Sequence, residues 1–274
     1  MNKLDQIRHF LYSREKNTNL SDILKNKRVI LIGPAPYLEM VGDGELIDKF
    51  DIIIRLKSGY PIPSVLKSKI GSRTDIYYTN FKENQNYLTI PTYLQMIKEN
   101  IKIIVFPYPR DFVYTHIPHN EKKLVELLRK NFTKAIMTLN KIPNYPIHIK
   151  SDSTPTYMIN LNKLIGTRAT TGILAILDLL QYDLKELHLT GFTFRSELIE
   201  QQRKIIVPGS DQITNVLNNV YSDYYKNDFS RERSWDKTIA DGTHDLQKEL
   251  NFFKILCQID PRIIIDSIMK KKLN

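Results

Sequence analysis

Apolar residues along the chain gather in short blocks that alternate with segments of helical repeat. Three blocks rich in branched apolar residues and bounded by turn residues are typical of buried strands. They cover residues 28–33, 101–106 and 185–192, and a second apolar run, 51–56, follows the first block. Helical patterns cover 39–50, 120–132, 170–182 and 244–256. This alternation predicts an α/β fold, a mostly parallel sheet with helices on both faces.

The helical segments differ in how they distribute their apolar residues. Segment 170–182 is apolar on nearly every side, which predicts a buried helix, whereas 244–256 is amphipathic. Segment 39–50 contains two glycines that weaken it. The stretch 193–243 is polar and contains a proline, so we expect a long loop with some helix, where an active-site loop would lie.

Ligands of parallel α/β sheets bind beyond the carboxyl ends of the strands. Four segments are therefore expected to form a site together. They are the turn 33–37, the segment 56–60 after the second apolar block, the loop 192–195, and the start of the buried helix at 167–172.

Composition narrows the class of protein. The chain has 274 residues, of which 42% are hydrophobic, enough for one large domain or two small ones. Cys257 is the single cysteine, so an internal disulfide is excluded, and a reducing, cytoplasmic location is expected. No apolar run approaches the length of a membrane span. The scattered charges of the N-terminus predict an amphipathic helix and no signal peptide.

The net charge of +10 favours anionic partners. Nucleic acid, a membrane surface and a phosphorylated small molecule all qualify, as does a basic surface with no specific partner. Aromatic and basic residues do not interleave in any compact segment, so no nucleic-acid partner is predicted.

Gly33 and Arg55, at the first and second apolar runs, each have two readings. Gly33 ends the first strand, but no G-x-G-x-x-G follows it. It permits a tight strand-to-helix turn, or close approach of the backbone to a mononucleotide. Arg55 stands inside an apolar run. It forms an ion pair with Asp48 or Asp51, or it contacts a phosphate or sugar together with Lys57.

The segment "TRATTG" offers a second candidate anion site. Thr170, Thr171 and Gly172 open the apolar helix, and Arg168 precedes them. Threonine caps helices, and hydroxyls beside the free amides of a helix N-terminus also bind phosphate or carboxylate. Both readings remain open from the sequence.

His244 stands at the start of the last amphipathic helix. It is a surface or capping residue, or a general base acting near neutral pH. Glu249 follows five positions later and is expected to fix the helix by contacting another element. The sequence contains no Asp-x-Asp pair and no clustered His/Cys set, so no metal and no cofactor are predicted.

In this order, the motifs resemble those of the eukaryotic-type sialyltransferases, glycosyltransferase family 29. The segment "VILIGPAPYLEMVGDGELIDKFDIIIRLK" is similar to the long sialylmotif through Gly44, Ile47, Asp48, Asp51 and Arg55. "IGSRTDIYYTN" and "VFPYPRDF" resemble the segments that follow it. "TRATTGILAILDLLQYDLKELHLTGFTF" is similar to the short sialylmotif, and "HDLQKE" fits His-x4-Glu. The resemblance covers about residues 28–260.

The resemblance implies a single Rossmann-like domain of the GT-A type over residues 28–268, preceded by an N-terminal helical extension at 1–27. It implies metal-independent, inverting transfer from a nucleotide-activated donor, a CMP-sugar above all, to a glycan or glycoconjugate acceptor. His244 would be the general base, supported by Glu249 and Arg168. The donor would lie along Gly33, Ala35, Arg55, Lys57, Thr170, Thr171, Gly172, Gly191, Phe192 and Tyr225, with Tyr224 and Tyr225 standing for the third motif.

Several positions depart from the family pattern. Pro34 and Lys57 stand where the family has asparagine, Asp223 where it has histidine, and Tyr182 where it has the cysteine of a disulfide. A catalytically inactive nucleotide-binding protein of the same fold is therefore the alternative function.

Overall fold

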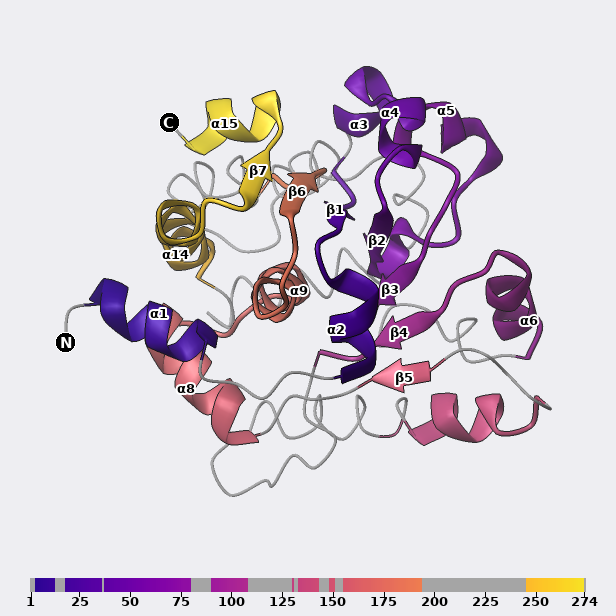
Figure 1. Cartoon of the computed structure of the whole chain (residues 1–274), viewed down its shortest axis with the longest axis horizontal. Coiled ribbons are helices and arrows are strands. Elements are labelled where there is room, and N and C mark those ends of the chain that lie inside the picture. The colour runs from indigo at the N-terminus through magenta and orange to yellow at the C-terminus, as the bar shows by residue number, and fades with distance from the viewer. Residues whose placement is uncertain are drawn as a thin grey trace, which may run out of the picture.

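The computed structural model describes residues 3–12, 18–35, 37–79, 90–107, 130, 133–142, 148–150, 155–193 and 245–273. Within these residues, seven strands form one parallel sheet in the order β5-β4-β3-β2-β1-β6-β7 (Figure 1). They are β1 (Arg28–Ile32), β2 (Ile52–Leu56), β3 (Ile76–Tyr78), β4 (Ile103–Val105), β5 (His148–Lys150), β6 (Glu186–Thr190) and β7 (Ile263–Ile265). The predicted parallel sheet is confirmed.

The helices connect and cover these strands. They are α1 (Lys3–Tyr12), α2 (Thr18–Leu24), α3 (Tyr37–Val41), α4 (Gly44–Asp48), α5 (Lys67–Ile70), α6 (Ile90–Lys98), α8 (Pro155–Ile165), α9 (Thr171–Leu180), α14 (Leu246–Ile259) and α15 (Ser267–Leu273). Short 3₁₀ turns occupy η1 (Lys57–Gly59) and η2 (Ser64–Leu66), and residues 133–139 are also helical.

The predicted helices agree with the structure where it describes them. Segment 170–182 becomes α9, and 244–256 becomes α14. Segment 39–50 corresponds to two short helices, because the Asp43 side chain accepts a hydrogen bond from the Leu46 amide and begins α4 there. Segment 120–132 lies outside the described residues except for Lys130, as does 193–243 except for Thr193.

Both faces of the sheet are covered by helices. Successive residues of β1 point to opposite faces: Val29 and Leu31 join the core of α9 and α14, whereas Ile30 and Ile32 join a second core with α3 and α4. Figure 1 shows α8, α9 and α14 on one side of the sheet and α3, α4 and α5 on the other. The predicted layering is therefore confirmed.

The first core extends to the N-terminal helices. Ile7 and Leu11 of α1 and Leu20 and Leu24 of α2 are at most 2% exposed and belong to the same cluster as the sheet residues. The helices predicted as an N-terminal extension therefore pack into the core of the main domain. Among the described helices, none combines the length and the apolar character needed to cross a bilayer.

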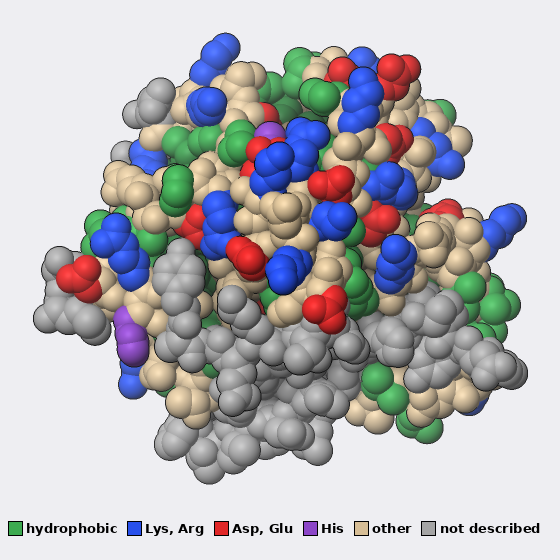
Figure 2. Space-filling view, viewed as in Figure 1, with side chains coloured by type: hydrophobic (Ala, Val, Ile, Leu, Met, Phe, Trp, Pro, Cys, Tyr) green, Lys and Arg blue, Asp and Glu red, His purple; other side chains and the backbone are tan. Residues whose placement is uncertain are grey.

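The positive charge of the chain does not collect on the face drawn in Figure 2. On the described part of this face, Lys and Arg side chains alternate with Asp and Glu side chains (Figure 2). Among the ion pairs of the described residues, Arg28 Nε contacts Glu186 Oε1 at 2.6 Å. This surface gives no support to the reading in which charge alone attracts nucleic acid.

Candidate functional site

A pocket lies at the carboxyl ends of the central strands. The strand order reverses between β1 and β6, because β2 follows β1 on one side while β6 begins the other side. Crevices of α/β sheets form at such a switch point. The pocket lies there and is lined by Pro34, Ala35, Leu56, Lys57, Thr170, Thr171, Gly172, Ile173, Gly191, Phe192, Thr193, Leu246 and Glu249.

Its floor is the place where the chain leaves β1 and β6. The Gly33 amide donates to the Thr190 carbonyl at 2.8 Å, and the Ala35 amide donates to the Gly191 carbonyl at 3.0 Å. A Cβ atom on Gly33 would stand 2.3 Å from the Gly191 carbonyl oxygen, so the two backbones touch. Gly191 also has a φ of +75°, which glycine adopts without strain.

Two residues that the sequence did not single out lie behind this floor. The Gly191 amide donates to the Tyr37 hydroxyl at 2.7 Å, and this hydroxyl donates to Asp266 Oδ2 at 2.5 Å. Burial, together with Asp266, raises the pKa of Tyr37, so the phenol stays neutral and keeps donating. The available signal was weak: Asp266 directly follows the apolar run of β7, as residues at strand ends of a site do.

Lys57 supplies a positive charge at the end of β2. It is half-buried, lines the pocket, and has a φ of +45°. Its carbonyl accepts a hydrogen bond from the Tyr77 hydroxyl at 2.7 Å, which holds the turn. Left-handed conformations are costly for lysine, and such strained residues gather at functional sites.

The start of α9 forms another wall of the pocket. Thr170 occupies the N-cap position, but its side chain makes no capping hydrogen bond, so plain capping does not explain this threonine. Its amide instead donates to the Glu249 carboxylate on α14. Thr171, Gly172 and Ile173 form the first turn at the pocket, where backbone amides have no intrahelical acceptor.

The start of α14 is fixed against the start of α9. Glu249 is 4% exposed and bonds across to Thr170, while the Asp245 amide donates to Thr167 Oγ1 at 2.8 Å. The expectation that Glu249 contacts another element is therefore confirmed. These contacts place Leu246 in the pocket wall.

The structure brings together most of the residues that the sequence proposed for the site. Those that line the pocket are Ala35, Lys57, Thr170, Thr171, Gly172, Gly191, Phe192 and Glu249. Gly33 lies directly against Gly191. Arg168 is half-buried and does not line the pocket. His244, Tyr224 and Tyr225 lie outside the described residues.

For Arg55, the structure gives a different explanation from a donor contact. Arg55 is fully buried and does not line the pocket. Its Nη2 donates to the Ile70 carbonyl at 2.6 Å, and its Nε donates to Thr74 Oγ1 at 3.0 Å. The guanidinium therefore satisfies the turn that links α5 to β3.

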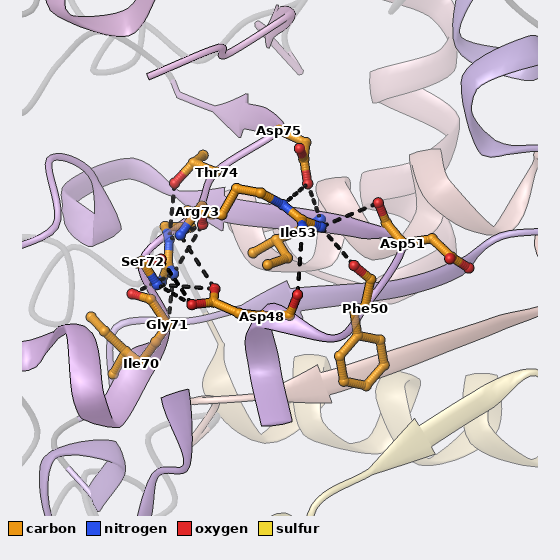
Figure 3. Close-up of polar contacts among 11 residues, drawn as sticks. Asp48, Phe50, Asp51, Ile53, Ile70, Gly71, Ser72, Arg73, Thr74 and Asp75 are labelled. Atoms are coloured by element: carbon orange, nitrogen blue, oxygen red, sulfur yellow. Dashed lines mark hydrogen bonds and ion pairs between the residues drawn. The ribbon is translucent and has the colours of Figure 1, made fainter. Parts of the chain in front are cut away.

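The same turn is held from its other side. The Asp48 carboxylate accepts hydrogen bonds from the amide and hydroxyl of Ser72 and from the Arg73 amide (Figure 3). Arg73 Nη2 donates in turn to the Phe50 carbonyl at 2.6 Å. Asp48, Arg55 and the segment "GSRT" thus form one structural unit beside the pocket, although they carry much of the sequence resemblance.

We expect Arg55→Met to lower the free energy of unfolding by about 3 kcal/mol or more, because the buried carbonyls and Thr74 lose their donor. Urea unfolding measures this. Arg28→Met is the matched control: Arg28 begins the neighbouring strand β1, and its ion pair with Glu186 is 42% exposed on the arginine side, so a loss below about 1 kcal/mol is expected. Equal losses would contradict the structural role of Arg55.

The described residues contain no group of three or more His, Cys, Asp or Glu side chains arranged to hold a metal ion. The charged side chains among those that line the pocket are Lys57 and Glu249. The remaining lining combines three threonines with apolar side chains and backbone, which suits a ligand with both an anionic and an apolar part.

Most of the chain matches the model of one protein family. Residues 4–260 match the model of glycosyltransferase family 29 (sialyltransferase). Comparison with curated proteins gives no match. Among solved structures, a mammalian sialyltransferase shares 17% identity over 97% of this chain and 79% of its own, with a TM-score of 0.48.

Two further sialyltransferase structures share a similar sequence identity with this chain. The complex of a mammalian sialyltransferase with Gal-beta-1-3GalNAc-ortho-nitrophenol shares 16% identity over 97% of this chain and 79% of its own, with a TM-score of 0.49. The sialyltransferase CstII from Campylobacter jejuni with cytidine-5'-monophosphate shares 15% identity over 78% and 77% of the chains, with a TM-score of 0.38.

Proposed function

Because this chain belongs to glycosyltransferase family 29, the sialyltransferases, we propose that it transfers a sugar from a CMP-activated donor to a glycan hydroxyl, with inversion and without a metal ion. The observation that carries the proposal is the convergence of the β1, β2 and β6 ends with the start of α9 on one pocket. The segments that the sequence motifs singled out thus meet where a nucleotide would bind.

The polar side of the pocket suits the phosphate of the donor. Lys57 brings a fixed charge, Thr171 a hydroxyl, and the first turn of α9 its amides and helix dipole. The wall formed by Pro34, Ala35 and Phe192 is apolar and suits the flat face of a base or the ribose. Lys57 stands at a position where the family pattern has asparagine, and we expect its ammonium group to make the donor contact in place of that asparagine.

We assign the general base to His244. This residue directly precedes Asp245, whose amide donates to Thr167 in the segment that leads into α9, and Leu246 lines the pocket. In the proposed step, the acceptor oxygen attacks the anomeric carbon as the bond to the donor phosphate oxygen breaks. The imidazole takes the hydroxyl proton, and the nucleoside monophosphate leaves with the bonding electron pair.

The positive charge and the amide donors around the leaving phosphate would supply the stabilisation that a metal ion provides in other enzymes. Negative charge grows on the phosphate as the bond breaks, next to Lys57 and the N-terminal turn of α9. Donors that are already in place stabilise this charge without reorganisation. Glu249, held by the Thr170 amide, fixes the relative position of α14 and α9, which we expect to set the distance between base and donor.

Titration with nucleotides tests the proposed donor. We expect CMP to bind about tenfold or more tightly than cytidine, because the phosphate adds charge-assisted hydrogen bonds. UMP is expected to bind more weakly than CMP. Lys57→Met should reduce the affinity for CMP but not for cytidine, whereas Lys102→Met, at an exposed residue before β4, should leave both unchanged. Equal binding of CMP and cytidine would reject the phosphate site.

A second candidate function is nucleotide binding without transfer. It is favoured by Pro34 and Lys57, which line the pocket at positions where the family pattern has asparagine. A CMP-sialic acid hydrolysis assay separates the two: release of CMP supports the enzyme, and binding without turnover supports the inactive protein. The cytoplasmic location and the acceptor class stay predictions.

A further inference from the structure

Two residues outside the sequence motifs, Tyr37 and Asp266, connect the C-terminal end of the chain to the pocket floor. Tyr37 begins α3, and Asp266 lies between β7 and α15. They are 229 positions apart in sequence, yet the phenol donates to Asp266 Oδ2. The side chain of Tyr37 is 9% exposed, so this contact is largely shielded from water.

Asp266 is itself held firmly. Thr190 Oγ1 donates to the same Oδ2 at 2.8 Å, and the Met269 amide donates to Oδ1 at 2.8 Å. The Asp266 amide donates to the Leu189 carbonyl at 3.3 Å, which continues the pairing of β6 with β7. The carboxylate is thus a fixed acceptor for the phenol.

The Tyr37 phenol oxygen contacts the pocket floor on the side away from the pocket. It accepts a hydrogen bond from the Gly191 amide at 2.7 Å, while the Gly191 carbonyl accepts one from Ala35. Gly191, Phe192 and Thr193 all line the pocket. The position of this three-residue turn therefore depends on where the Tyr37 oxygen is held.

We propose that Tyr37 and Asp266 are positioning residues for the nucleotide subsite: the Asp266–Tyr37–Gly191 chain of hydrogen bonds holds the turn 191–193 against which the donor binds. This proposal rests on the proposed function for the identity of the donor. Tyr37 itself does not line the pocket, so it acts through Gly191 and not by direct contact.

A comparison of two variants separates this role from simple stabilisation. Tyr37→Phe retains the ring but removes the acceptor of the Gly191 amide. Tyr78→Phe is the matched control: it removes the hydroxyl of a buried tyrosine of β3 that donates to Asp178 Oδ2 at 2.7 Å, and Tyr78 does not line the pocket. Both variants lose a buried hydrogen bond to a carboxylate, so both are expected to lower the thermal midpoint by similar amounts.

The two variants should differ in their ligand parameters. With Tyr37→Phe, we expect the Kd of CMP and the KM of a CMP-sugar to rise about tenfold, as after loss of a buried hydrogen bond, with kcat within about threefold of the wild type. With Tyr78→Phe, the Kd should stay within about twofold of the wild type. Unchanged CMP binding in Tyr37→Phe, or an equal loss in Tyr78→Phe, would overturn the proposal.

Hydrogen exchange distinguishes failure of the positioning proposal from a wrong assignment of the nucleotide donor. The Gly191 amide should exchange faster in Tyr37→Phe than in Tyr78→Phe, with or without nucleotide. If the wild type fails to bind CMP while this exchange difference is present, the donor assignment is wrong and the positioning by Tyr37 stands. Equal exchange in both variants would overturn the positioning itself.

Discussion

Replacing His244 with alanine is expected to slow sugar transfer by about a hundredfold or more while CMP binding survives. General base catalysis contributes about 10² to 10⁴ in rate, and the imidazole is proposed to act on the acceptor hydroxyl and not on the nucleotide. The pocket residues that would hold the phosphate lie directly after β2 and at the start of α9, so the substitution leaves them in place. Turnover at saturating donor and calorimetric titration with CMP measure the two effects separately.

The control for this variant is His9→Ala. His9 is an exposed residue of α1, and its replacement should change neither turnover nor nucleotide affinity. Wild-type turnover in His244→Ala would remove this histidine from the mechanism. Loss of CMP binding together with turnover would instead show that His244 contributes to the nucleotide pocket.

Gly33→Ala is expected to cause a loss of stability as large as that of Arg55→Met. A Cβ at this position would stand 2.3 Å from the Gly191 carbonyl oxygen and 2.9 Å from its carbon. These are backbone atoms, so no side chain can rotate away, and β1 and β6 have to separate at their carboxyl ends. We expect a loss of about 3 kcal/mol or more in the free energy of unfolding, measured by urea denaturation.

Gly59→Ala provides the comparison for this glycine. Gly59 follows the neighbouring strand β2 in η1, and a Cβ there would lie 3.6 Å from the Arg55 Cβ, which is an ordinary contact distance. The change should stay within about 1 kcal/mol of the wild type. A stable Gly33→Ala protein that binds CMP normally would contradict the close approach of the two backbones.

The sequence alone predicted the elements that lie within long apolar or amphipathic runs, including the three-residue strand β4 inside the run 101–106, and it missed β3, β5 and β7. The helix at 170–182 was recognisable because its residues are apolar on all sides, and β1 and β6 because their five residues are rich in branched apolar side chains. The strands β3, β5 and β7 have three residues each. Such runs are too short to show a repeat, and their inclusion in the sheet depends on pairing with a neighbouring strand.

Arg55 shows where a local pattern misleads. An arginine inside an apolar run requires a partner, and the sequence offered a carboxylate or a ligand. The structure provides the carbonyls of Ile70 and Gly71, which belong to a turn 15 and 16 positions later. Backbone carbonyls are present at every residue, so nothing in the sequence distinguishes those that a folded chain presents to a guanidinium.

The order of strand ends, turns and helix starts was sufficient to predict the parallel fold and the segments that meet at the pocket, because both follow from the alternation of buried strands and helices. Which side chains face the pocket and which serve the fold was decided by tertiary contacts alone. Tyr37 meets Asp266 and Gly191, and Thr170 meets Glu249. Periodicity records burial along one segment, whereas a hydrogen bond is made between segments that only the folded chain brings together.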